Sequence, residues 1–252
     1  MIKKIKVGNI PIHLFSVESL HQCVNDAVVK KQKKLFMHAN AHLVELANTT
    51  DTWLKDFFND EVDFVMCDGA GIQLAAKLYR LPVPEKIPYN IWIWTFIKFI
   101  TGHNFKIFFL GSNKEVVSKA VARLKEFSPS LKIAGYHHGY FNKNVNHEEN
   151  QRVIDLINKS EPDIILVGFG MPVQEKWVRE NFKSISAYAF FTCGGAFDFV
   201  SGKNPVAPWI FRKLYLEWLF RFALEPARLF GRVTISNFKF LSIIYQDLKK
   251  KR

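Results

Sequence analysis

Short runs of apolar residues without polar alternation recur along this chain, and each is followed by a segment with helical periodicity. Strands buried on both faces have this pattern, because helices cover both sides of a parallel sheet. The runs predict strands at Lys34–Ala39, Val62–Cys67, Phe105–Leu110, Leu131–Gly135, Asp163–Val167 and Tyr188–Thr192. We therefore expect a Rossmann-like α/β fold with a mainly parallel sheet and helices on both faces.

Helices are predicted between these strands at Ala41–Ala47, Ile72–Tyr79, Ser112–Phe127, Glu148–Ser160 and Gln174–Asn181. Ser112 and Glu115 have the spacing of a capping box, which would open the third of these helices. Ligands of such folds bind beyond the carboxyl ends of the strands. Residues that end or follow a predicted strand are therefore the first candidates for a functional site.

The C-terminal part has a different character from the rest of the chain. Lys213, Glu217, Arg221 and Glu225 recur every four residues and would form one charged stripe on a helix. Most other positions between residues 209 and 222 are apolar. A helix that is apolar beyond one face needs a second apolar surface, which a membrane or another subunit can supply.

Positive charge is concentrated in the same region. The formal net charge is +12, and from Ser201 onward there are eleven Lys and Arg against three acidic residues. Such a segment suits anionic lipid head groups. We expect residues 1–203 to form the α/β core and residues 204–252 to form a basic, amphipathic, helical appendage that docks on an anionic membrane surface. Packing of this appendage against a second copy in a homo-oligomer is the alternative.

Cysteine usage and hydropathy indicate the compartment. Cys23, Cys67 and Cys193 lie far apart without a CxxC, which predicts neither a disulfide framework nor a structural zinc site. The N-terminus lacks the apolar stretch of a signal peptide. No run reaches the ~20 uninterrupted apolar residues of a transmembrane helix. We expect a cytoplasmic protein, peripherally associated with the inner face of the cell membrane.

Chemically distinctive residues lie at the ends of five predicted strands. In chain order they are His38 and Asn40; Asp68-Gly69-Ala70-Gly71; Gly111-Ser112; Gly168-Phe169-Gly170 with Gln174 and Glu175; and Gly194-Gly195 with Asp198. Asp-Gly after a strand is often only a turn, and the GxG at position 168 lacks the third glycine of a dinucleotide fingerprint. The residues by themselves do not decide whether these loops take part in catalysis or only form turns.

Several familiar motifs are absent. The chain has no Asp-x-Asp to hold the metal of a nucleotide-sugar diphosphate, no GxxxxGK[ST] loop and no GxSxG elbow. His38 and His42 lie four residues apart, but the glutamate of an HExxH motif is missing. We therefore expect neither a metal nor a cofactor. If a diphosphate leaves, Arg or Lys must stabilise its charge.

Four motifs in order resemble the WecG/TagA/CpsF bacterial glycosyltransferases over nearly the whole chain. They are NAHLVELA from Asn40, CDGAGI from Cys67, GFGMPVQE from Gly168, and a C-terminal block with GGAFDFVSG from Gly194, Ala207-Pro208, LEWLFR from Leu216 and EPARL from Glu225. Each motif is modest alone. Their common order and spacing make the resemblance specific.

The resemblance implies a metal-independent, inverting transfer of a hexose-type sugar from a UDP-sugar to a saccharide on a polyprenyl diphosphate. The product would enter surface polysaccharide or wall teichoic acid synthesis, and the sugar would be N-acetylmannosamine, its uronic acid or glucose. Asp68 would be the general base. Arg221, Arg228 and Arg232 would bind the diphosphate, so that the appendage completes the active site. Substrate contacts are expected from His38, Asn40, Gly69, Gly71, Lys86, Gly111, Gly168, Gln174, Glu175, Gly194 and Gly195.

One run departs from the family pattern. Where the family commonly has Arg-Val-x-Gly-x-Asp, this chain has Lys86-Ile87-Pro88-Tyr89-Asn90-Ile91, so Lys replaces Arg, Tyr replaces Gly and Ile replaces Asp. A lysine cannot reproduce the planar, bidentate recognition of an arginine. Either the donor or acceptor differs from those of the best-known members, or the loop is repacked around unchanged chemistry.

Two other classes of protein fit parts of the sequence. The net charge and the aromatic content suit a nucleic-acid-binding module, which would bind oligonucleotides with a steep salt dependence. The strand pattern also suits an NAD-type dehydrogenase. The first leaves Asp68 and the Gln174-Glu175 loop unexplained, and the missing third glycine speaks against the second. We expect no nucleic-acid partner.

Overall fold

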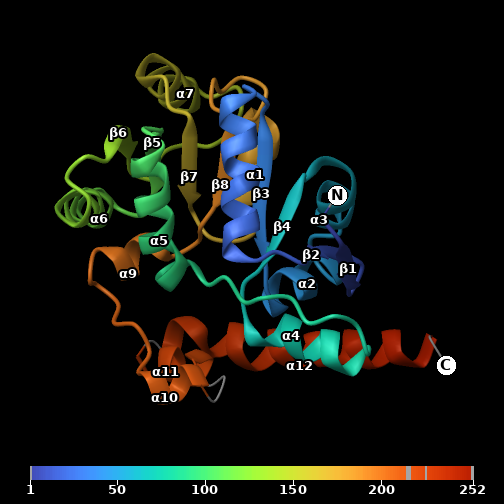
Figure 1. Ribbon diagram of the computed structural model, residues 1–252. Coiled ribbons are helices and arrows are strands. Elements are labelled where there is room, and N and C mark those ends of the chain that lie inside the picture. The colour runs from blue at the N-terminus through green and yellow to red at the C-terminus, as the bar shows by residue number, and fades with distance from the viewer. Residues whose placement is uncertain (1, 214–216, 225, 251–252) are drawn as a thin grey trace.

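A six-stranded parallel sheet forms the centre of the computed structural model, which describes residues 2–213, 217–224 and 226–250 (Figure 1). Within these ranges, the side chains of residues 212, 213, 218, 221 and 227–235 lie outside the description. The strand order is β4-β3-β8-β7-β5-β6. In chain order the strands are β3 (Lys34–Ala39), β4 (Phe64–Cys67), β5 (Lys106–Gly111), β6 (Lys132–His137), β7 (Ile164–Gly168) and β8 (Ala189–Thr192).

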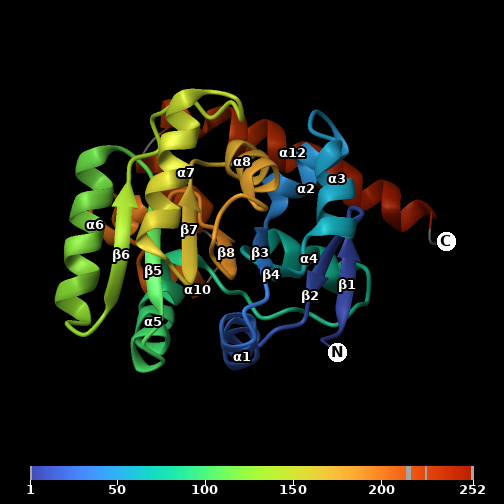
Figure 2. The same ribbon diagram turned by 90° about the horizontal axis from the view of Figure 1, so that it is seen from above.

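Every pair of neighbouring strands in this sheet is parallel, so the predicted fold class is confirmed. Apolar and polar residues do not alternate along these strands, so apolar side chains point to both faces of the sheet. Each face therefore needs a cover of helices. Helices α1 (Val17–Val29) and α5 (Tyr89–Gly102) lie on one face, and α7 (Glu148–Ser160) and α8 (Val173–Asn181) lie on the other (Figure 2).

The predicted start of α6 (Lys114–Phe127) is wrong. The N-cap is Asn113, whose side-chain oxygen accepts a hydrogen bond from the Val116 backbone N–H at 2.8 Å. Ser112 has φ +52°, a left-handed conformation that turns the chain between strand and helix. Asn caps a helix as well as Ser does, so the sequence pattern alone did not separate the two positions.

The N-terminal elements were not among the sequence predictions. Strands β1 (Lys4–Val7) and β2 (Ile10–His13) form an antiparallel hairpin beside β4. Its two turn residues, Gly8 and Asn9, both have positive φ, as a type I′ turn requires. Helix α3 (Trp53–Asp56) and the π-helical turn η1 (Phe57–Glu61) then lead into β4.

The described residues of the C-terminal region form α9 (Ala196–Val200), α10 (Trp209–Lys213), α11 (Glu217–Leu224) and α12 (Pro226–Lys250). Helix α12 lies along α2 (Ala41–Asn48) and beside α4 (Ala70–Leu78) (Figure 1). Phe240 and Ile244 of α12 are buried in the same core as these two helices. Much of the predicted stripe, including Glu225 and the Lys213 and Arg221 side chains, falls outside the described residues.

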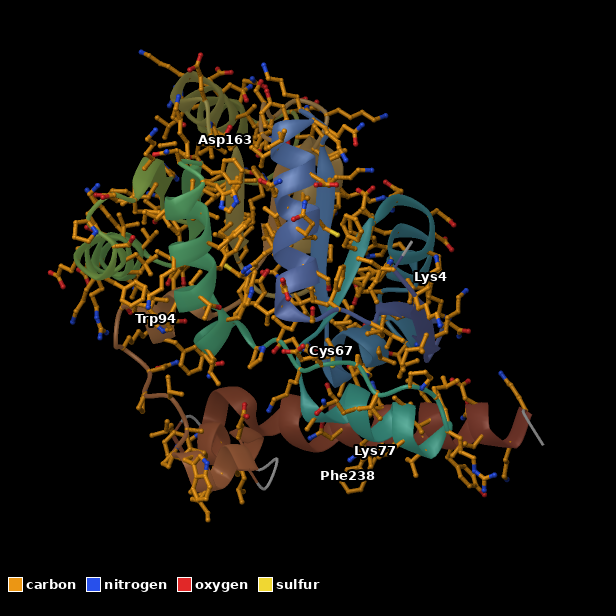
Figure 3. All side chains as sticks on the ribbon, in the orientation of Figure 1. Lys4, Cys67, Lys77, Trp94, Asp163 and Phe238 are labelled. Atoms are coloured by element: carbon orange, nitrogen blue, oxygen red, sulfur yellow. The ribbon has the colours of Figure 1, made fainter. Side chains whose placement is uncertain are left out.

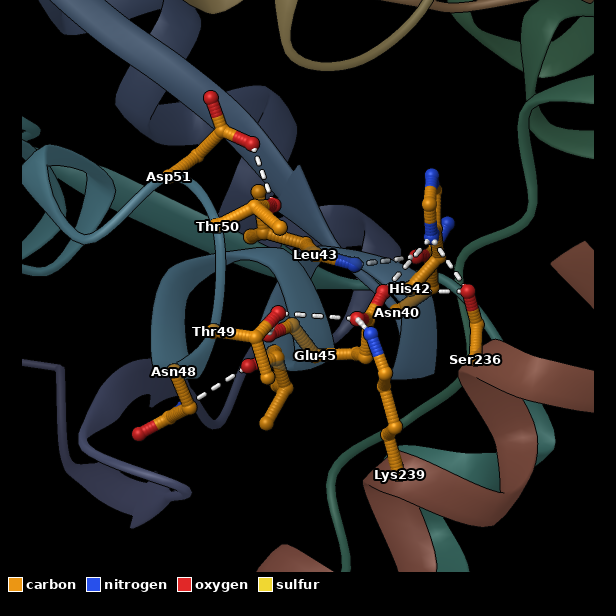
Figure 4. Close-up of polar contacts among 11 residues, drawn as sticks. Asn40, His42, Leu43, Glu45, Asn48, Thr49, Thr50, Asp51, Ser236 and Lys239 are labelled. Atoms are coloured by element: carbon orange, nitrogen blue, oxygen red, sulfur yellow. Dashed lines mark hydrogen bonds and ion pairs between the residues drawn. The ribbon is translucent and has the colours of Figure 1, made fainter.

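A buried carboxylate joins α12 to α2. Glu45 accepts hydrogen bonds from the hydroxyls of Thr49 at 2.9 Å and Ser236 at 3.0 Å and from the Lys239 ammonium at 3.3 Å (Figure 4). The Tyr79 hydroxyl donates to Asp247 at 2.8 Å farther along α12. Residues 236–247 of the appendage thus pack on the core, and the boundary at residue 203 stays a prediction.

Among the residues that the structure describes, every helix is too short or too polar to span a bilayer.

Candidate functional site

The carboxyl ends of the parallel strands bring most of the predicted site residues to one edge of the sheet. Asp68 follows β4, and its backbone N–H donates to Ala39 at the end of β3 at 2.8 Å. Cys193 follows β8 and donates to Val167 of β7 at 2.8 Å. These bonds extend the strand pairing by one residue, so that the loops that carry candidate residues start from a fixed edge.

Asp68 lies beside His38 at this edge. The Asp68 Oδ2 and the His38 Nε2 are 3.7 Å apart, and the side chains are 25% and 5% exposed, respectively. The His38 Nδ1 donates a hydrogen bond to the Thr192 carbonyl oxygen at 2.6 Å. The structure therefore leaves one carboxylate partly open to solvent, with a buried imidazole behind it.

Asn40 and Gly69 open the two helices nearest to Asp68. The Asn40 side-chain oxygen caps α2 by accepting from the Leu43 N–H at 3.1 Å. Gly69 has φ +135°, a conformation that side chains rarely adopt, and precedes α4. A Cβ at Gly71 would lie 3.0 Å from the Cβ of Ala41, so this glycine allows α4 to pack closely on α2.

Gln174 and Glu175 lie beneath the surface and organise two glycine loops. Both side chains are fully buried. The Gln174 oxygen accepts from the backbone N–H groups of Gly170 at 3.2 Å and Gly194 at 3.0 Å, and its nitrogen donates to Glu175 at 2.8 Å. Burial raises the pKa of Glu175 to about 7. Their predicted substrate contacts stay predictions, because in this structure the Gln174 amide holds the backbone of both loops.

Three further predicted glycines let the strand ends approach one another. A Cβ at Gly111 would lie 2.3 Å from the Gly168 carbonyl oxygen, and a Cβ at Gly168 would lie 2.7 Å from that of Gly194. Only glycine fits such contacts. Gly195 is the N-cap residue of the short helix α9, and a Cβ there would meet the Asp198 carboxylate at 3.5 Å.

The run that departs from the family pattern also reaches this edge. Tyr89 is 5% exposed, and its ring packs edge-on against His38 with 5.2 Å between ring centroids. Its hydroxyl is buried without a hydrogen-bond partner among the described residues. Lys86 donates to the Glu217 carboxylate of α11 at 2.7 Å, and the two side chains are 18% and 23% exposed. This ion pair links the loop after α4 to the C-terminal region.

Sequence reasoning missed a cavity at the neighbouring strand ends. It has a volume of about 590 Å³ and is lined by Ser112, Gly139, Tyr140, Phe141, Asn142, Lys143, Glu149, Gly168, Phe169 and Val173. The Lys143 ammonium lies 4.7 Å and 4.5 Å from the ring centroids of Phe141 and Phe169. Burial lowers the pKa of Lys143. The sequence patterns indicate Ser112, Gly168 and Phe169, and Val173 belongs to the GFGMPVQE motif, but Lys143 lies in a polar loop without a recognisable pattern.

The structure describes the side chains of only some of the predicted cationic residues. Lys86 lies within electrostatic reach of Cys67, which precedes Asp68. The side chains of Arg221, Arg228 and Arg232 lie outside the described residues. Among the residues that are described, no group of three His, Cys, Asp or Glu is arranged to hold a metal ion.

Comparisons with known proteins identify the family of this chain. The chain is 29% identical over 214 residues to the N-acetylglucosaminyldiphosphoundecaprenol N-acetyl-beta-D-mannosaminyltransferase of Staphylococcus aureus strain NCTC 8325 / PS 47, which covers 85% of this chain and 79% of that protein. The protein of the same name from strain MRSA252 is 28% identical over the same length. The sequence profile of the glycosyl transferase WecG/TagA/CpsF family matches residues 5–252, and this chain belongs to that family of glycosyltransferases.

Proposed function

We propose that this glycosyltransferase moves a hexose-type sugar from a UDP-sugar to a saccharide on a polyprenyl diphosphate, in surface polysaccharide or wall teichoic acid synthesis. The observation that carries the proposal is Asp68, a partly exposed carboxylate at the carboxyl edge of a parallel sheet. The Staphylococcus aureus relative is named for transfer of N-acetylmannosamine to an undecaprenyl-diphosphate-linked acceptor. N-acetylmannosamine is therefore the first sugar to test, ahead of its uronic acid and glucose.

In the proposed reaction Asp68 removes the proton of the acceptor hydroxyl. The oxygen attacks the anomeric carbon from the face opposite to the nucleotide, which inverts the configuration. The bond from the anomeric carbon to the diphosphate breaks, and its electron pair leaves with UDP. A base placed in this way contributes ~10² to 10⁴ in rate.

The leaving diphosphate needs cationic stabilisation. We assign this role to Arg221, Arg228 and Arg232 of the appendage, and a donor contact to Lys86, which lies within electrostatic reach of Cys67, the residue before Asp68. The positive charge of these residues replaces the metal clamp that the sequence lacks. No metal or cofactor is required by this scheme.

We place the donor nucleotide in the cavity beside β5 and β7. A uracil ring can stack on aromatic side chains, and Tyr140 and Phe169 supply them there. Lys143 supplies a cation at the same wall. The cavity volume of about 590 Å³ lies in the range of small-molecule sites.

A membrane-facing surface follows from the lipid acceptor. Exposed apolar side chains gather on α10 and α12, namely Trp209, Ile210, Phe238, Leu241 and Tyr245, and on α4, namely Leu74 and Leu78. Lys77 and Phe238 project from the same end of the molecule (Figure 3). We propose that this end meets the anionic inner face of the cell membrane, as a peripheral contact. Self-association through the same surface is the competing outcome.

The test is a panel of UDP-sugars with a lipid-diphosphate-linked N-acetylglucosamine acceptor, in which UDP release is measured in excess EDTA. We expect turnover with at least one donor, and a loss of ~10² to 10⁴ in the Asp68→Asn variant, with its melting temperature unchanged. Turnover of Asp68→Asn at the wild-type rate would remove the base from the mechanism. Loss of all activity in EDTA, with recovery on added magnesium or manganese, would overturn the metal-free scheme.

A further inference from the structure

His38 is too deeply buried to be an ordinary substrate contact. The residue is 4% exposed and lies in β3, next to the centre of the sheet. The carboxylate of Asp68 is 25% exposed and is therefore the more accessible of the two groups. Any effect of the His38 imidazole on the reaction therefore passes through Asp68.

The neighbours of the imidazole fix its orientation and its tautomer. Nδ1 lies 2.6 Å from the Thr192 carbonyl oxygen, which can only accept a hydrogen bond, so Nδ1 carries a proton. The ring of Tyr89, a residue of α5, packs edge-on against the imidazole. In this orientation Nε2 faces the Asp68 Oδ2 at 3.7 Å. The atom turned toward the base is the ring nitrogen that is able to gain or lose a proton.

Two hydrogen-bond acceptors that face each other repel unless a proton lies between them. A neutral His38 with its proton on Nδ1 would present a lone pair to the Asp68 carboxylate. A proton on Nε2 would turn this contact into a hydrogen bond from the imidazolium to the carboxylate. Hydrogen bonds at catalytic groups are often long before substrate binds, so a separation of 3.7 Å is compatible with proton transfer in the complex.

We propose that His38 shares the proton that Asp68 removes from the acceptor hydroxyl, so that the two residues act as a proton-accepting dyad. The proposal rests on the proposed transferase function and extends it. The acceptor O–H bond breaks as its oxygen bonds to the anomeric carbon, and the electron pair of the donor bond leaves with UDP. The proton passes from Asp68 to Nε2 and leaves an imidazolium between the Asp68 carboxylate and the Thr192 carbonyl.

The buried hydroxyl and thiol nearest to the dyad do not compete for this proton at neutral pH. Tyr89 from α5 and Cys193 after β8 are buried, and burial raises the pKa of both well above neutrality. Glu175 from α8 lies within electrostatic reach of Tyr89, and its pKa of about 7 leaves it partly protonated. Lys86 is a cation that pairs with Glu217.

Steady-state kinetics across pH test the dyad with His38→Gln beside His38→Ala. A glutamine amide can still donate a hydrogen bond to Asp68, but it cannot take up a proton. We expect both variants to lose about 10- to 100-fold in kcat, at the lower end of the range for a lost proton acceptor, with little change in donor KM. Wild-type kcat and an unchanged pH profile in His38→Gln would overturn proton sharing and leave only an orienting role.

A second measurement does not need turnover. In protein with ¹⁵N-labelled histidine, we expect His38 to gain its second proton at a higher pH in the wild type than in Asp68→Asn. Equal titration of His38 in the two proteins would overturn the dyad even if both are inactive. A wild-type protein that shows this difference but transfers no sugar from any donor would instead overturn the proposed function.

Discussion

Replacement of Glu45 by alanine tests whether α12 is part of the core. The Glu45 side chain is 5% exposed and holds three hydrogen bonds, two of them to α12 (Figure 4). The Glu45→Ala variant leaves the buried Ser236 hydroxyl without this acceptor, while Thr49 keeps a bond to the Glu45 backbone carbonyl at 2.9 Å. The loss thus falls mainly on the contact between α2 and α12.

The magnitude follows from these partners. Hydrogen bonds to a charged acceptor contribute ~1.5–3 kcal/mol each, and the Ser236 hydroxyl keeps the His42 Nδ1 at 3.1 Å as a partner, so it is not left unpaired. Lys239 is 46% exposed, so its ion pair is screened by solvent and adds less than ~1 kcal/mol. Relief of the desolvation of Glu45 opposes the loss. We expect a net destabilisation of about 2–3 kcal/mol, which corresponds to a fall of about 5–10 °C in Tm for a chain of this size.

Thermal unfolding and amide hydrogen exchange of α12 are the assays. The matched control is Lys239→Met, which keeps the apolar stem and removes only the exposed charge, and we expect its Tm to stay within about 2 °C of wild type. An unchanged Tm and unchanged exchange protection of α12 in Glu45→Ala would refute the reasoning. In that case the network would not hold α12 on the core.

The pKa of Glu45 predicts how the thermal stability changes at acidic pH. Burial raises the pKa of Glu45, but its hydrogen bonds from Thr49, Ser236 and Lys239 outweigh this effect and lower the pKa below the ordinary value of 4.5. A lowered pKa contributes stability above pH 4.5, and this contribution is lost as the pH falls through the folded-state pKa. The Tm difference between wild type and Glu45→Ala should therefore shrink below pH 4.5.

Three further predictions concern other parts of the molecule. Tyr89→Phe removes a buried hydroxyl without a described partner, so Tm should stay level or rise, and a fall of several degrees would reveal a hidden partner. Burial lowers the pKa of His13 and His21 to about 4, so the folded state favours the neutral form of both residues. Tm should therefore fall as the pH drops from 6.5 to 4, and it should fall less steeply in His21→Gln. Identical slopes of Tm against pH in the two proteins would contradict this. Arg221→Ala and Arg228→Ala should lower turnover with a water-soluble acceptor analogue as well as with the lipid acceptor, and a loss confined to the lipid acceptor would assign them to membrane docking alone.

Local patterns determined the strands of the central sheet and the edge at which the site lies. The apolar run Lys34–Ala39 is observed as β3 with the same bounds, and the other predicted strands differ by one or two residues at their ends. A strand that is apolar on both faces can only lie inside a covered sheet, so the fold class follows from the sequence. The candidate residues then share one edge, because parallel strands all end on the same side.

The contacts that make this edge a site were decided only by the tertiary structure. His38 meets a carbonyl 154 residues away, and Glu45 meets a hydroxyl 191 residues away. Gln174 was predicted as a substrate contact, but its amide is fully buried and holds two glycine loops together. Periodicity reports which side of an element is buried, whereas the partner of a buried polar group depends on strand order and helix packing, which no local pattern contains.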